Sequence, residues 1–254
     1  MRGFGAFLGK ELREIVRTWR IWVLPGIVLF FALTGPPLAK VTPELMKSFV
    51  ASQPGVVFQL PEPTYIDAYA AWIKNLSQMM VFAVIIIFGG LVTSETKSGT
   101  AVLVLTKPLS RPAFVLAKFS GALILLIGSI AAGVLATWAV TKVTFGVAPI
   151  RLLVETTGTW LAFGVLLLGV MTLVSAWQSS QAGAAGLGIG VWFVLTLLTL
   201  WEPAVHYSPA GLAGAANAVL ARTGADLMWP LVTGAVMVGV CVAAAVGVFS
   251  RREL

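Results

Sequence analysis

Long apolar runs separated by short polar segments dominate the pattern of this chain. Six of the runs have about the length that an α-helix needs to cross the hydrocarbon core of a bilayer. The pattern therefore predicts six membrane-spanning helices, with boundaries that can shift by a few residues at each end. The expected spans cover residues 21–38, 76–93, 119–140, 160–176, 182–201 and 230–249.

Tryptophan positions and composition agree with these spans. Indole side chains prefer the interface between lipid and water. Trp192 lies in the middle of a span, but six other tryptophans lie near expected span ends, namely Trp22, Trp138, Trp160, Trp177, Trp201 and Trp229. Of the 254 residues, 58% are hydrophobic and 11% are charged, so there are too few charges to cover a soluble surface. We therefore expect residues 1–254 to form one all-α transmembrane domain.

The basic residues indicate how the spans are oriented. An even number of spans places both termini on one side, and the segments expected on that side carry the whole net charge of +7. The segments expected on the other side contain equal numbers of basic and acidic residues. Since cytoplasmic loops collect lysine and arginine, we expect a multi-pass protein of the plasma (inner) membrane with both termini cytoplasmic. Cations that border apolar runs also argue against a nucleic-acid partner.

Residues 1–20 have the pattern of an amphipathic helix. At about 100° per residue, one face is apolar and contains Phe4, Leu8, Leu12, Ile15, Trp19 and Trp22. The opposite face is cationic and contains Lys10, Arg13, Arg17 and Arg20. We expect this helix to lie in the membrane interface, with its apolar face among acyl chains and its cations against anionic headgroups. Two roles remain open, a topological anchor and a lever gripped by a cytoplasmic partner.

The sequence offers no constellation for catalysis within the membrane. Such catalysis needs a nucleophile with a base, a pair of acids or a set of metal ligands. The single histidine, His206, lies in an expected outer loop, and the single cysteine, Cys241, lies inside an apolar run. We therefore expect a protein that is not an enzyme and that has no metal site or cofactor of its own.

The expected spans contain no clearly placed ionisable side chain, whereas ion-coupled carriers usually keep one there. Uncharged polar side chains do occur, and five of them are candidates to line a translocation path: Asn75, Gln78, Ser175, Thr196 and Thr199. Such a path would suit amphipathic or lipid-like cargo. Hydrogen bonds between helices are the alternative role for these groups. Transport by this chain would need an external source of energy.

Small residues recur every four positions in the fifth span, at Ala182, Gly186 and Gly190. The neighbouring glycines look like a dinucleotide-binding loop, but they lie within an apolar helix and no strand precedes them. A stripe of small residues lets two helix backbones approach closely. We expect this stripe to pack either within the chain or against a second copy.

The segment between the second and third spans contains an ordered set of polar and turn-forming residues. In chain order these are Glu95, Gly99, Thr100, Pro108, Ser110, Arg111 and Lys118, with an apolar stretch before the proline. In order and spacing they resemble the cytoplasmic loop of the ABC type-2 transporter permease family. The resemblance covers nearly the whole chain, because that family has an amphipathic elbow helix followed by six spans and a long outer segment between spans five and six.

The resemblance implies a role for each of the polar segments. Residues 202–228 would be the outer segment, with residues 213–221 as a short helix that re-enters the membrane. Residues 95–118 would be a coupling loop, which together with the elbow helix contacts an ATPase. The candidate coupling residues are Glu11, Arg13, Arg17, Glu95, Lys97, Gly99, Thr100, Leu103, Lys107, Pro108 and Arg111.

The chain would therefore be the permease subunit of an ABC exporter for drug-like or lipid-like cargo. The resemblance implies that it pairs with a second permease copy, identical or different, and with ATPase subunits that bind ATP and Mg. Apolar Leu103 and rigid Pro108 suit a groove on such a partner, and nearby cations can steer the approach. A non-transporting membrane scaffold or assembly factor that docks a cytosolic partner through the same loop is the second hypothesis.

Overall fold

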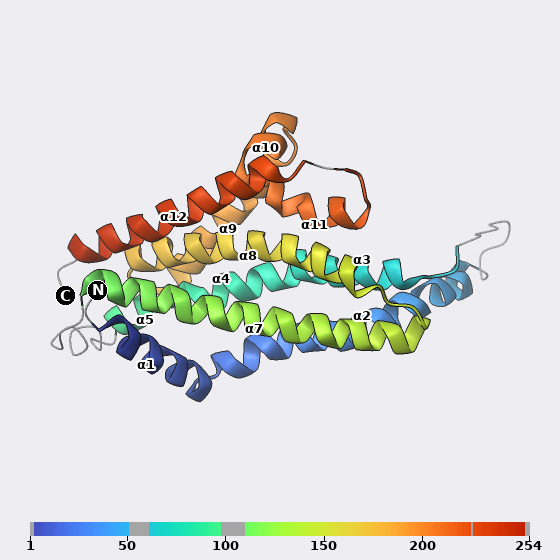
Figure 1. The fold of residues 1–254 in the computed structure, drawn as a ribbon, viewed down its shortest axis with the longest axis horizontal. Helices are drawn as coiled ribbons and strands as arrows, with labels where there is room; N and C mark the ends of the chain where they lie inside the picture. Colours follow the sequence, from blue (N-terminus) through green and yellow to red (C-terminus); the bar gives the residue numbers. More distant parts are fainter. Residues whose placement is uncertain (1–2, 51–60, 98–109, 225, 252–254) are drawn as a thin grey trace.

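The chain forms an elongated bundle of helices (Figure 1). The computed structural model describes residues 3–50, 61–97, 110–224 and 226–251, and no strand occurs within these ranges. The predicted all-α class is therefore confirmed. In chain order the elements are α1 (Phe4–Arg17), α2 (Arg20–Val50), α3 (Tyr65–Asn75), the π-helical turn η1 (Leu76–Met80), α4 (Val81–Gly89), α5 (Thr93–Lys97), α7 (Arg111–Phe145), α8 (Ile150–Trp177), α9 (Gln181–Leu198), α10 (Glu202–Tyr207), the 3-10 turn η2 (Pro209–Gly211), α11 (Leu212–Leu220) and α12 (Met228–Arg251).

Six helical segments in the described ranges are long and apolar enough to cross a membrane. They are Ile21–Met46, Tyr65–Lys97, Arg111–Phe145, Ile150–Trp177, Gln181–Leu198 and Met228–Arg251. Each overlaps one predicted span, so the number and order of spans are confirmed. The predicted starts of spans two, three and four, at residues 76, 119 and 160, are about ten residues late. Hydropathy detects only the apolar part of a helix, whereas backbone hydrogen bonding continues through the polar turns at its ends.

The second span consists of four pieces rather than one continuous α-helix. It begins at a capping box, in which the Thr64 backbone N–H donates to Asp67 Oδ2 at 2.7 Å and Thr64 Oγ1 accepts from the Ile66 backbone N–H at 3.3 Å. The π-helical turn η1 contains Gln78. Turns of this kind occur frequently at functional sites. After α4 the chain breaks at Gly90 and resumes in α5.

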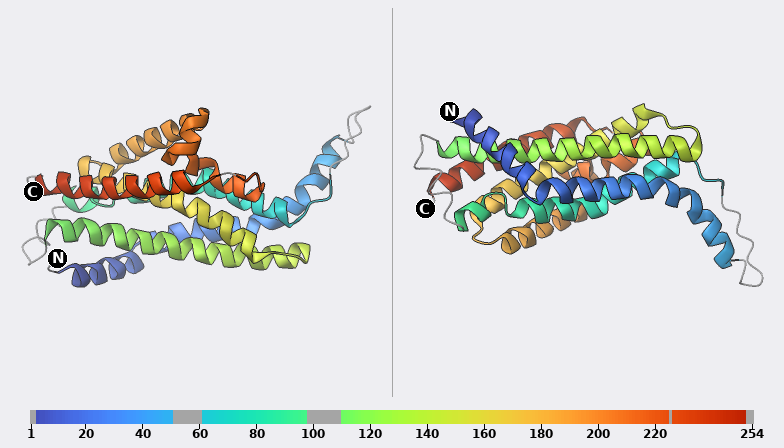
Figure 2. Two further views of the ribbon diagram at one scale, coloured as in Figure 1. Left: turned by 45° about the horizontal axis from the view of Figure 1, so that its top comes forward. Right: turned by 90° about the horizontal axis from the view of Figure 1, so that it is seen from below.

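Proline shapes the first span. α2 contains Pro25, Pro36, Pro37 and Pro43, and each removes a backbone donor and crowds the preceding turn. Figure 2 shows the distal part of α2 bending away from the bundle. The proximal part stays packed, since Leu24 is buried there.

α8 is the central helix and packs against α7, α12, α11 and α4 (Figure 1). Trp72 of α3 is buried against it and donates its indole N–H to Thr157 Oγ1 at 3.0 Å. Gly133 of α7 lies where α2 and α3 approach, because a Cβ there would overlap Val28 and Trp72. The core of the bundle therefore depends on a close approach that only glycine permits.

Both ends of the described chain lie at one end of the bundle, which we call the terminal end (Figures 1 and 2). This agrees with an even number of spans. α10 lies above the middle of the bundle in Figure 1 and α11 extends from there away from the terminal end, and α11 confirms the short helix predicted at residues 213–221. α11 packs on α8 through buried Leu212, Ala215 and Ala216. Its re-entry into the membrane stays a prediction.

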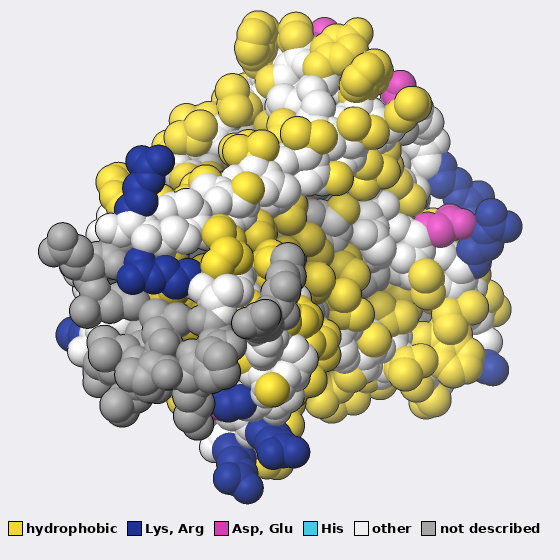
Figure 3. Space-filling model, turned by 60° about the vertical axis from the view of Figure 1, so that its left-hand side comes forward, with side chains coloured by type: hydrophobic (Ala, Val, Ile, Leu, Met, Phe, Trp, Pro, Cys, Tyr) yellow, Lys and Arg dark blue, Asp and Glu magenta, His cyan; other side chains and the backbone are white. Residues whose placement is uncertain are grey.

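The flank of the bundle is apolar. In Figure 3 hydrophobic side chains cover the surface between the two ends, whereas lysine and arginine side chains gather near the ends. A belt of this kind suits hydrocarbon, while cations at the ends suit the headgroup regions.

Candidate functional site

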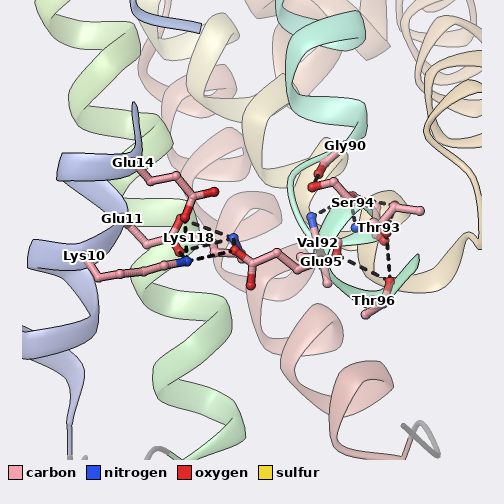
Figure 4. Close-up of polar contacts among 11 residues, drawn as sticks. Lys10, Glu11, Glu14, Gly90, Val92, Thr93, Ser94, Glu95, Thr96 and Lys118 are labelled. Atoms are coloured by element: carbon pink, nitrogen blue, oxygen red, sulfur yellow. Dashed lines mark hydrogen bonds and ion pairs between the residues drawn. The ribbon is translucent and has the colours of Figure 1, made fainter. Parts of the chain in front are cut away.

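Three elements that are distant in sequence meet in a group of charged side chains at the terminal end. α1 contributes Lys10, Glu11 and Glu14, α5 contributes Glu95, and α7 contributes Lys118 (Figure 4). We call these five residues the charge cluster. Lys118 Nζ lies 2.7 Å from Glu95 Oε1 and 3.2 Å from Glu11 Oε2. Lys10 Nζ lies 3.1 Å from Glu95 Oε1 and 3.2 Å from Glu11 Oε1. The cluster therefore joins α1 to the helices on both sides of residues 98–109.

Burial makes these ion pairs important for the fold. The side chain of Lys118 is 1% exposed, and those of Glu11 and Glu95 are 5% and 8% exposed. A buried charge that loses its partner is strongly destabilising, whereas an exposed pair contributes little. The cluster consequently holds α1 against α7 as long as all of its buried members are paired.

Lys10 closes the cluster on its solvent side. Burial alone would lower the pKa of Lys10, but a hydrogen bond with Glu14 and the charges of Glu95 and Glu11 raise it above its ordinary value. Because the pKa is higher in the folded chain, the stabilisation is complete below the ordinary lysine pKa. It is lost only as the pH rises through the folded-state pKa.

One ring of a stack of three aromatic side chains lies beside the buried ammonium group. Lys118 Nζ lies 5.2 Å from the ring centre of Phe114, which stacks on Phe7 of α1 at 5.2 Å and on Phe249 of α12 at 4.8 Å. The face of an aromatic ring attracts a cation, so Phe114 adds to the attraction that the carboxylates exert on the ammonium group. The C-terminal helix is thereby connected to the same site.

The carboxylates of the cluster do not fit a resident metal ion. Oxygens of Glu11, Glu14 and Glu95 lie within 4.8 Å of one another, a spacing that a cation could bridge. However, the ammonium groups of Lys10 and Lys118 already lie among these oxygens. A divalent ion would have to displace both lysines, so we assign the cluster a structural role.

Glu95 and Lys118 lie within long helical segments but just outside the predicted apolar spans, residues 76–93 and 119–140. α7 begins at Arg111, which places Lys118 two turns inside the helix, and Glu95 lies within the second spanning segment. The spans predicted from hydropathy leave out both residues, because each residue lies at the edge of an apolar run. Their mutual pairing allows them to be buried there.

The other candidate coupling residues are placed in three ways. Arg13, Arg17 and Lys97 are exposed at the terminal end. Arg111 at the start of α7 donates from its guanidinium to the Ser250 backbone carbonyl oxygen at 2.5 Å. The remaining candidates, Gly99, Thr100, Leu103, Lys107 and Pro108, lie outside the described residues.

Ser175, a candidate path residue, is instead buried where α8 meets the break between α4 and α5. Its Oγ accepts from the backbone N–H groups of Val92 at 2.9 Å and Thr93 at 3.2 Å. Thr93 Oγ1 in turn donates to the Ser175 backbone carbonyl oxygen at 2.8 Å. These bonds satisfy backbone groups that the broken helix leaves without a partner, which matches the alternative role considered for the polar residues.

Two other candidate path residues lie on a common exposed surface. Phe82 of α4 and Trp192 of α9 form an edge-to-face pair with ring centres 5.1 Å apart. Gln78 lies four residues before Phe82, and Thr196 lies four residues after Trp192. The two helices run in opposite directions, so Gln78 and Thr196 occupy the same level, and both are exposed.

Of the remaining two path candidates, Asn75 approaches α2, because its Nδ2 lies 4.0 Å from the position of a Cβ at Gly35. Asn75 and Thr199 are half-buried. Thr199 Oγ1 donates to the Thr196 backbone carbonyl oxygen at 2.7 Å. Uncharged polar groups exposed on a spanning helix are the type of side chain that a path or a second chain would cover.

The small-residue stripe does not mediate packing within the described chain. Ala182, Gly186 and Gly190 are exposed, and a Cβ at either glycine would meet no atom within 4 Å. α9 packs through another face, where Ala184 and Gly188 are buried. The stripe follows one face of α9, but the rotation of the helix places that face outward.

A six-span helical bundle with an apolar flank and a charged end defines a multi-pass membrane protein. Residues 6–221 match the ABC-2 family of transporter proteins, from α1 to the end of α11. The match includes the charge cluster and most of the chain, so the protein belongs to this family of ABC transporter permeases. Members of the family are membrane subunits without catalytic activity of their own. No curated protein matches the chain.

Proposed function

We propose that the chain is the permease subunit of an ATP-driven exporter in the plasma (inner) membrane, with both termini cytoplasmic. The observation that supports this most strongly is the charge cluster. It joins α1 to α5 and α7, the two helices that flank residues 98–109, through buried ion pairs. A force applied to that segment or to α1 would therefore reach the second and third spans together.

The motor in this proposal is a separate ATPase subunit, which supplies the sites for ATP and Mg. Exposed Arg13, Arg17 and Lys97 give the terminal end a cationic surface that favours association with an acidic partner. Glu11 and Glu95, which we expected to contact the partner, would act indirectly by fixing the position of α1, because both are buried.

The path would lie along the exposed surface between α4 and α9 that carries Gln78 and Thr196. A second permease copy facing this surface would enclose these polar groups, and the outward stripe at Gly186 and Gly190 would let the two copies approach closely. Gln78 and Thr196 are themselves uncharged, and Phe82 and Trp192 between them are aromatic. This combination suits drug-like or lipid-like cargo with a small polar group.

A reconstitution experiment tests the proposal. The chain is purified with an ATPase encoded beside it, placed in liposomes, and assayed for ATP turnover and ATP-dependent movement of a fluorescent phospholipid. K97E alters an exposed lysine of α5, and K74E alters an exposed lysine of α3 at the other end of the bundle. We expect K97E to reduce turnover and transport several-fold and K74E to leave both unchanged.

The scaffold hypothesis predicts a different result. A scaffold would still bind the ATPase, and K97E would weaken that binding, but no ATP-dependent movement of lipid would occur with the unmodified chain. Equal effects of K97E and K74E would contradict coupling at the terminal end.

A further inference from the structure

An apolar groove lies on the flank of the bundle beside α1. Its walls come from three helices, with Leu12 and Val16 on α1, Pro25 on α2, and Gly128 and Ser129 on α7. Its volume of about 320 Å³ is in the range of small-molecule sites. The groove is thus large enough to hold part of a lipid.

The chemistry of the groove suits hydrocarbon. Ser129 is the only hydroxyl-bearing residue among its described lining residues, and its Oγ donates to the Leu125 backbone carbonyl oxygen at 2.7 Å. The described lining side chains therefore need no hydrogen bond from a bound molecule. Gly128 faces open space in the groove, because a Cβ at this position would meet no atom within 4 Å.

Two arginines of α1 adjoin the groove-lining residues in sequence. On α1, Arg13 lies about one turn before Val16, and Arg17 directly follows Val16. Both arginines are exposed, and neither has an ion pair among the described residues. The carboxylates of the same helix, Glu11 and Glu14, are occupied by lysines of the charge cluster.

Exposed indoles place the groove at the level of the membrane interface. Trp19 and Trp22 are 51% and 78% exposed where α1 passes into α2. Tryptophan prefers the boundary between headgroups and hydrocarbon. A lipid at this level would have its headgroup beside α1 and its acyl chain along the flank.

A second apolar groove allows a comparison of the charged residues near each groove. It lies between α7 and α8, has a volume of about 340 Å³ and is lined by residues that include Val154 and Gly158. The arginine of α8 near this groove, Arg151, is paired with Glu155 through an Nε to Oε1 distance of 2.7 Å. The two grooves are similar in size, but only the first has lining residues that adjoin arginines without acidic partners among the described residues.

We propose that the groove beside α1 binds one anionic phospholipid of the surrounding bilayer. An acyl chain lies along Leu12, Pro25 and Gly128, and the headgroup phosphate contacts Arg13 and Arg17. The lipid fills the space between α1, α2 and α7 and so stabilises α1 at the terminal end. This inference concerns the purified chain alone and does not depend on an ATPase partner.

Native mass spectrometry of the purified full-length chain tests the proposal, with phosphatidylglycerol and phosphatidylcholine as competing probes. We expect one phosphatidylglycerol to bind more tightly than phosphatidylcholine. R13Q/R17Q should remove this preference and weaken phosphatidylglycerol binding roughly 30-fold, since each interfacial cation contributes about fivefold. G128L fills the groove with a side chain and should abolish the tight site.

G158L is the matched control, because it places the same side chain in the second groove, where a Cβ also meets no atom within 4 Å. It should leave the phosphatidylglycerol site intact. Equal binding of the two lipids, or retention of the tight site in both R13Q/R17Q and G128L, would overturn the proposal. Loss of the groove through pairing of two copies, detected as a dimer that excludes lipid, would overturn it as well.

Discussion

Lys118 neutralises two carboxylates that are buried beside it. Its ammonium group contacts Glu11 of α1 and Glu95 of α5. Attraction inside a protein offsets desolvation only when every buried charge keeps its partners. Accordingly, each of the two buried glutamates contacts both lysines of the charge cluster.

Replacing Lys118 should therefore destabilise the protein strongly. We expect K118M to lower the free energy of unfolding by about 3 to 5 kcal/mol, because it leaves Glu11 and Glu95 without their main counter-charge. Thermal unfolding in detergent measures the effect. K74M, at an exposed lysine of α3, should change stability by less than about 0.5 kcal/mol. A second change, E95Q, should restore part of the loss in K118M, and failure to do so would argue against charge as its cause.

Ser175 should be important for a different reason, since its hydroxyl accepts two backbone N–H groups at the break between α4 and α5. S175A should lower stability by about 1 to 3 kcal/mol, because buried donors would lose their acceptor. S129A is the control, since Ser129 Oγ bonds only to its own helix at the Leu125 carbonyl oxygen. The two unfolding temperatures give the comparison, and similar values would refute a special role for Ser175.

At the level of helices, close packing depends on particular glycines. Gly133 of α7 faces Val28 and Trp72, and Gly188 of α9 faces Met171 and Ile85. Met171 is flexible and can adjust, whereas Trp72 is buried and bonded to Thr157. The contact of α7 with α2 and α3 is thus the less tolerant of the two.

A pair of alanine substitutions in α7 tests this contact. G133A should lower stability by about 1 to 3 kcal/mol through overpacking against Trp72. G128A should be neutral or slightly stabilising, because alanine is the better helix former and meets no neighbour at that position. Chemical or thermal unfolding of both variants provides the test, and the reverse order would mean that the helices pack differently.

At the scale of the whole molecule, the arrangement of charges predicts its orientation in the membrane. Both ends of the described chain lie at the terminal end, where exposed Arg13, Arg17 and Lys97 also lie. Cations of this kind are retained on the cytoplasmic side.

Cysteine labelling in intact cells can check this orientation. The background is C241A, which removes the single, buried cysteine. V143C, at an 88% exposed position near the far end of α7, should react with an impermeant maleimide added outside. S250C, exposed near the end of α12, should react only after permeabilisation. The opposite labelling pattern would reverse the proposed orientation.

Local patterns determined the number and order of spans, the amphipathic character of α1 and the position of the polar segments. These could be predicted because a helix that crosses hydrocarbon needs apolar side chains along its whole length. A long run of apolar residues is therefore enough to identify a span. The pairing of Glu11, Glu95 and Lys118 could not be predicted in this way, since the three residues come from separate segments. The i, i+4 spacing of Phe7, Glu11 and Ile15 was the one local signal that Glu11 shares a buried face.

Only the tertiary structure decided which side of each helix faces another. It buried Ser175 against Thr93, exposed the stripe at Gly186 and used Gly188 for packing instead. The rotation and register of a helix depend on the summed contacts of all its neighbours, which no short stretch of sequence contains. In this chain the sequence determined which segments cross the membrane, and packing determined which of their polar residues meet.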